Sequence, residues 1–85
     1  MSSHLSEEVT RLAIDTGRQR VRDHRITKEL TMILGYCHLT EMHEMYRTAL
    51  RNHVEAFIEL TRANQHADLC DSSSRILRIV DGIDS

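Results

Sequence analysis

His24 and the basic residues around it are the side chains of this sequence best suited to chemistry. A neutral imidazole is a good nucleophile at physiological pH, so His24 is a candidate nucleophile. Cationic side chains favour docking against an acidic partner site, and here they are Arg20, Arg22, Arg25 and Lys28. We therefore treat these four residues as candidate partner-binding residues.

Other kinds of chemistry have less support in the sequence. A helical metal site needs histidines three or four residues apart, whereas His38 and His43 are five apart and no Glu-x-x-His pair occurs. The serines at 72–74 lack any surrounding pattern for a nucleophile. The three glycines are isolated, so no phosphate-binding loop is present. We expect no metal, no cofactor and no hydrolase activity.

The segment that must position His24 runs from Asp23 to Leu39 and has the pattern of an amphipathic helix. At about 100° per residue, His24 lies roughly 140° from the middle of an apolar arc. That arc is about 100° wide and contains Ile26, Leu30, Ile33, Leu34 and Cys37. We expect these five residues to form a buried dimer core and His24 to remain accessible to a partner.

This segment resembles the H-box of the dimerisation and phosphoacceptor domain of sensor histidine kinases. The match consists of a histidine followed at the family's spacing by ELTMILGY, where the family has a run like PLTAILGY; the matching residues are His24, Leu30, Thr31, Ile33, Leu34, Gly35 and Tyr36. The final stretch, 75–84 (RILRIVDGID), is similar to that domain's second helix. The resemblance implies two-component signalling, with His24 as phosphoacceptor and a response regulator receiver domain or a sensor kinase as partner.

The sequence departs from the family at three positions around the histidine. Arg25 stands where the family has an acidic residue for acid/base chemistry, Lys28 where it has Thr or Asn, and Glu29 where it has proline. With 85 residues there is no room for an ATP-binding domain, so autonomous kinase activity is excluded. The enzyme activity implied is at most histidine phosphotransfer. A non-catalytic regulatory role stays open.

The composition predicts an all-α fold in a single domain, residues 1–85. There is no proline, and no dipeptide typical of a hairpin turn. We expect one long, locally weak helix to about Leu39, with either a kink near Thr16–Gly17 or a polar layer inside the bundle. A second helical stripe runs from Met42 to Thr61, and 64–74 reads as a loop whose Ser73 or Ser74 caps a short third helix. So small a helical chain has a marginal core, which predicts a homodimer forming a four-helix bundle.

Charge and apolar content limit the partners. Six basic residues lie between Arg11 and Lys28 against two acidic ones, while the remainder has five basic and eleven acidic residues. The Arg18–Lys28 basic cluster leaves nucleic-acid association open as an alternative, although a sequence pI of about 6.3 makes it the weaker one. No apolar run could span a membrane and no signal peptide is present. Two separated cysteines indicate reduced thiols in the cytoplasm. The Met1 start favours a complete small protein over a fragment of a sensor kinase.

Overall fold

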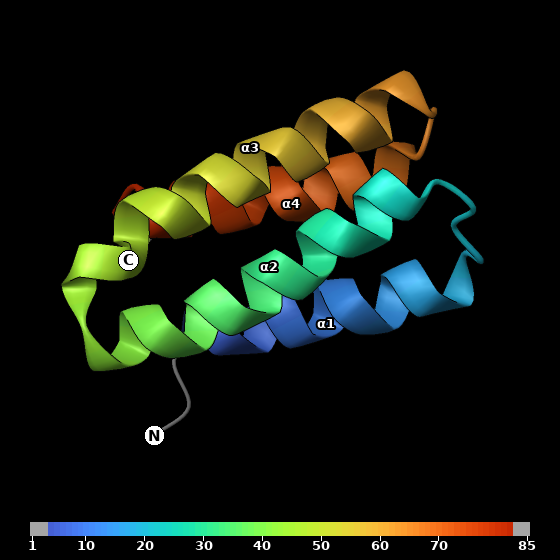
Figure 1. The fold of residues 1–85 in the computed structure, drawn as a ribbon. Helices are drawn as coiled ribbons and strands as arrows, with labels where there is room; N and C mark the ends of the chain where they lie inside the picture. The colour runs from blue at the N-terminus through green and yellow to red at the C-terminus, as the bar shows by residue number, and fades with distance from the viewer. Residues whose placement is uncertain (1–3, 83–85) are drawn as a thin grey trace.

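A computed structural model describes residues 4–82 and confirms the all-α fold. The helices are α1 (His4–Arg18), α2 (His24–Met42), α3 (Arg47–Ala63) and α4 (Ala67–Val80), with a short 3-10 helix, η1 (Glu44–Tyr46), before α3. They form an antiparallel bundle in which each long helix packs against two neighbours, in the ring α1–α2–α3–α4 (Figure 1). The α1–α2 and α3–α4 connections lie together at one end of the bundle, and α1 begins and α4 ends at the other.

All four helices contribute apolar side chains to one core. Phe57 is the largest fully buried side chain and lies on α3. The buried positions recur every three or four residues, as expected of helices that cover one face; they are Val9, Leu12, Ile26, Ile33, Cys37, Leu50, Val54, Phe57, Ile58, Leu69, Ile76 and Val80. A buried side chain of this size contributes about 1.5–3 kcal/mol relative to an exposed one. A single copy of the chain therefore encloses a core of its own.

The expected long helix to Leu39 is wrong, because the chain turns back between α1 and α2. Residues 19–23 connect the two helices, and Arg20 there has the left-handed φ of 50°. Gly17, where a weak point was expected, is still helical, and the chain leaves the helix just after it. The reason is physical: 18–22 is rich in charged and amide side chains that cannot be buried between helices, and Asp23 supplies a new helix cap.

The expected loop at 64–74 is also wrong, because only 64–66 connects α3 to α4. Ser73 and Ser74 lie inside α4 and do not cap a helix. Ser73 is fully buried, and its hydroxyl donates to the carbonyl of Leu69 at 2.7 Å. The Ser74 hydroxyl donates to the carbonyl of Cys70 at 2.8 Å. Small side chains that satisfy their hydroxyls on the preceding turn can be helical and buried, so a polar run was misread as a loop.

The turn after α2, which the sequence left undecided, falls at His43. The stripe predicted from Met42 onward is buried only from Leu50, whereas Met42 and Met45 are 63% and 79% exposed. One chain thus supplies four long helices instead of the two long helices, with a possible short third, that the sequence predicted. None of the helices described is long and apolar enough to traverse a lipid bilayer.

Candidate functional site

The side chain of Asp23 fixes the start of α2, where His24 is the first helical residue. Its carboxylate accepts a hydrogen bond from the backbone N–H of Arg25 at 2.9 Å, which makes Asp23 the N-cap. It also accepts a bond of 3.2 Å from the side-chain amide of Asn64, at the end of α3. The two connections at this end of the bundle are therefore joined through Asp23.

Arg25 pairs with the same carboxylate. Its Nε lies 3.1 Å from one carboxylate oxygen of Asp23, and a terminal guanidinium nitrogen lies 2.8 Å from the other. The hydrogen bonds from the Arg25 side chain and from its backbone lower the pKa of Asp23 to about 2. The side-chain hydrogen bond to Asp23 and the charge of that carboxylate raise the pKa of Arg25. Asp23 therefore stays ionised at neutral pH and is a poor proton acceptor, although it directly precedes His24.

The His24 side chain is exposed and lies on the face of α2 opposite the core. The Thr27 hydroxyl donates to the backbone carbonyl of His24 at 3.0 Å, which ties the first turn to the helix. Among the described residues, no carboxylate is hydrogen-bonded to the imidazole of His24. The arrangement can present a nucleophilic nitrogen to a partner, and the partner would have to supply the acid/base group.

The four candidate partner-binding residues, Arg20, Arg22, Arg25 and Lys28, are all exposed. They lie on the α1–α2 connection and the first turns of α2, on both sides of His24 in the sequence. Together with Arg18 they form the Arg18–Lys28 cluster. Arg62, in the last turn of α3, adds another exposed cation at this end of the bundle, and Asp68, in the first turn of α4, adds a carboxylate.

The five residues expected in a dimer core divide into three groups. Ile26, Ile33 and Cys37 are buried within the chain's own core, and Leu30 packs partly buried against it. Leu34 is 42% exposed. Burial raises the pKa of the Cys37 thiol to about 11, with a smaller contribution from the charge of Glu41. Only Leu34 therefore offers a largely open apolar surface to another molecule.

Sequence reasoning missed a polar cluster between α2 and α3. The Nδ1 atom of His53 lies 2.6 Å from a carboxylate oxygen of Glu29, and both side chains are partly buried. The ring of Tyr36 stacks on His53, with centroids 5.3 Å apart and planes at 14°. Glu29 and Tyr36 are seven residues apart and share a helix face, but nothing in the sequence connects them to His53 on another helix.

Comparisons with protein-family models, with curated proteins and with solved structures find no match to this chain. The resemblance to the phosphoacceptor domain therefore depends on the residues quoted for it. Within 4–82, no three histidine, cysteine or carboxylate side chains lie together as ligands for a metal ion.

Proposed function

We propose that this protein is a regulatory adaptor of two-component signalling. It binds the receiver domain of a response regulator, or a sensor kinase, through the Arg18–Lys28 cluster, and His24 accepts a phosphoryl group from that partner. The observation that carries the proposal is the exposed His24 at the start of a rigid helix, next to exposed cations. The proposal assigns the protein to the cytoplasm, where receiver domains act.

Phosphoryl transfer requires little of this chain beyond an exposed His24 imidazole that the partner can reach. In the transfer, an imidazole nitrogen of His24 attacks the phosphorus of the partner's aspartyl phosphate. The bond from phosphorus to the aspartyl oxygen breaks, and the carboxylate leaves with the electron pair. The partner takes up the imidazole proton, because the Asp23 carboxylate is already bonded to Arg25. Arg22 and Lys28 attract the partner's acidic site and shorten the search for the productive orientation.

Charge reversal tests the docking half of the proposal. Arg22→Glu and Lys28→Glu should each weaken binding to a phosphorylated receiver domain, and the loss should shrink at high salt because the attraction is screened. Arg75→Glu reverses an exposed charge on α4 and serves as the matched control. Equal affinities for all three variants would contradict docking through the cluster.

We also propose that two copies associate through the outer face of α2 around Leu34 and Gly35. Leu34 is a large apolar side chain left open, and a Cβ placed on Gly35 would meet nothing within 4 Å, so another helix has room to approach. Leu34 lies about 15 Å along the helix from His24, so this contact leaves the histidine accessible. Sedimentation should show a dimer that Leu34→Asp converts to a monomer; a wild-type monomer at micromolar concentration would refute it.

A second candidate function is non-catalytic association with nucleic acid. It is favoured by one observation, the five exposed cations of the Arg18–Lys28 cluster, which could follow a phosphate backbone. Retention on DNA that falls with salt and is lost in the Arg20→Glu, Arg22→Glu double variant would support it. An absence of retention at low salt would eliminate it.

A further inference from the structure

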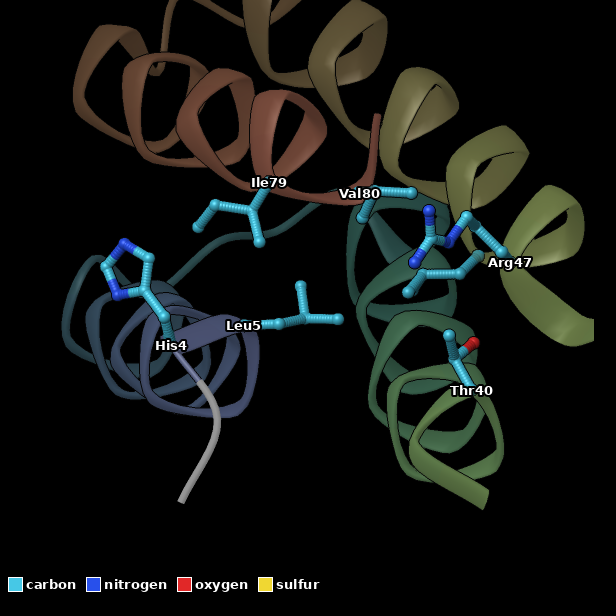
Figure 2. A pocket seen from close by; sticks show the side chains of 7 residues that line it. His4, Leu5, Thr40, Arg47, Ile79 and Val80 are labelled. Atoms are coloured by element: carbon cyan, nitrogen blue, oxygen red, sulfur yellow. The ribbon is translucent and has the colours of Figure 1, made fainter. Parts of the chain in front are cut away.

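A cavity opens at the end of the bundle opposite His24. Its volume is about 280 Å³. It lies between the first turn of α1, the last turns of α2 and α4, and the start of α3 (Figure 2). Its wall is mainly apolar and is formed by Leu5, Leu50, Ile79 and Val80, and His4 stands at its edge. This volume is slightly below the range of about 300–1,000 Å³ that is usual for small-molecule sites, so a ligand here would be small.

Thr40 lines this cavity and carries an unusual hydroxyl. The buried hydroxyls of two other threonines donate to the carbonyl four residues earlier, Thr16 at 2.7 Å and Thr61 at 2.8 Å. The Thr40 Oγ1 atom is buried but has no hydrogen-bond partner in the described part of the chain. The atom has almost no accessible surface, so a ligand in the cavity can accept its hydrogen bond only after the Thr40 side chain rotates about χ1. A buried hydroxyl without a partner is destabilising, which favours that rotation when an acceptor is bound.

Arg47 supplies a positive charge to the same cavity. In Figure 2 its side chain extends from the start of α3 across the opening toward Val80. The only ion pair that it forms among residues 4–82 is with Glu44, at 3.5 Å, and the two side chains are 50% and 78% exposed. Such a pair is weak in water, so the guanidinium can bind an anion without losing a strong partner.

We propose that this cavity binds a small monocarboxylate with an unbranched apolar tail, such as a medium-chain fatty acid. The tail packs against Leu5, Leu50 and Ile79. The carboxylate pairs with the Arg47 guanidinium and accepts a hydrogen bond from the Thr40 hydroxyl, which rotates out of its buried position to meet it. This site is separate from His24 and does not depend on the signalling role.

Titration of the full chain with sodium octanoate tests whether the cavity binds a monocarboxylate. Calorimetry measures the affinity, and methyl NMR shows where the ligand binds. We expect saturable binding at millimolar concentration or below, with shifts confined to Leu5, Leu50, Ile79 and Val80. Arg47→Gln should weaken binding roughly tenfold or more, and Thr40→Val about fivefold, as expected for a charged and a neutral hydrogen bond. Arg75→Gln, a change on α4 outside the cavity, should leave the affinity unchanged.

Three results would overturn the proposal. The first is no saturable binding of octanoate to the folded wild type. The second is any sign that the carboxylate plays no part in binding. Equal affinity of octanoate for the wild type and Arg47→Gln would show this, and so would equal affinity of the wild type for 1-octanol and octanoate. The third is methyl shifts outside the cavity. Thr40→Val adds a readout without ligand: removal of an unpaired buried hydroxyl should raise the melting temperature of the free protein.

Discussion

Asp23 and Arg25 bind each other across His24, with the Arg25 terminal nitrogen 2.8 Å from an Asp23 carboxylate oxygen. Arg25 occupies the position at which the histidine kinase family has an acidic residue. Its charge is partly neutralised by Asp23, on the other side of His24. The same carboxylate caps α2 and accepts a hydrogen bond from the side-chain amide of Asn64. The residues around His24 are held mainly by this one side chain.

Ionised Asp23 should stabilise the protein in a defined pH range. Its pKa falls from an ordinary value of 3.8 to about 2 in the fold, so the native state favours the ionised form. The stabilisation is complete above pH 3.8 and is lost as pH falls through about 2. Asp23→Asn keeps a residue that can cap a helix but does not titrate. Melting curves should show the wild type more stable at neutral pH, with the difference vanishing near pH 2; a difference independent of pH would contradict this.

Two adjacent residues of α2 should respond differently to truncation. Ile33 is fully buried, whereas Leu34 is 42% exposed. Ile33→Ala should lower the free energy of unfolding by about 2–5 kcal/mol because it leaves a cavity. Leu34→Ala should lower it by less than about 1 kcal/mol. Urea denaturation of the two variants, at a protein concentration low enough for the chain to be monomeric, measures both. A larger effect at Leu34 would then mean that α2 faces the core differently.

The contact between Glu29 and His53 should couple α2 to α3. A partly buried hydrogen bond between side chains in direct contact predicts a coupling of roughly 0.5–3 kcal/mol, toward the low end because both side chains retain some contact with water. A double-mutant cycle with Glu29→Gln and His53→Gln, measured by denaturation, gives this value. Glu59→Gln on the exposed face of α3 is the control. Additive effects of Glu29→Gln and His53→Gln would show that the pair does not interact in solution.

The two cysteines should differ in reactivity. Cys37 is buried and its thiol has a pKa of about 11, so almost none is thiolate at neutral pH. Cys70 is only partly buried. An aromatic disulfide reagent should therefore modify one thiol of the native protein, with the fast phase lost in Cys70→Ala and kept in Cys37→Ala. Fast modification of Cys37 in the folded protein would argue against its place in the core.

The sequence predicted helices and their buried faces better than the positions where they end. Periodic positions such as Ile26, Ile33 and Cys37 are recognised because each helix repeats its own pattern. The turn at 19–23 was missed because the apolar stripes on its two sides remain in angular register. The cap at Asp23 was a signal that could have revealed it.

Side-chain contacts between different helices could not be predicted from the spacing of residues in the sequence. Asn64 binds Asp23 from 41 positions away, and His53 binds Glu29 from 24 positions away. Such pairs depend on how the helices meet, which no local pattern encodes. The exposed position of His24, by contrast, follows from its angle on one helix.

Phosphoryl transfer to His24 tests the central claim most directly. Radiolabelled receiver domains, phosphorylated beforehand, would be mixed with the wild type and with His24→Ala and His38→Ala, the last removing an exposed histidine from the same helix. We predict acid-labile label on the wild type and on His38→Ala, and none on His24→Ala. Label that persists in His24→Ala, or no label on the wild type with any receiver domain of the source organism, would contradict His24 as the phosphoacceptor.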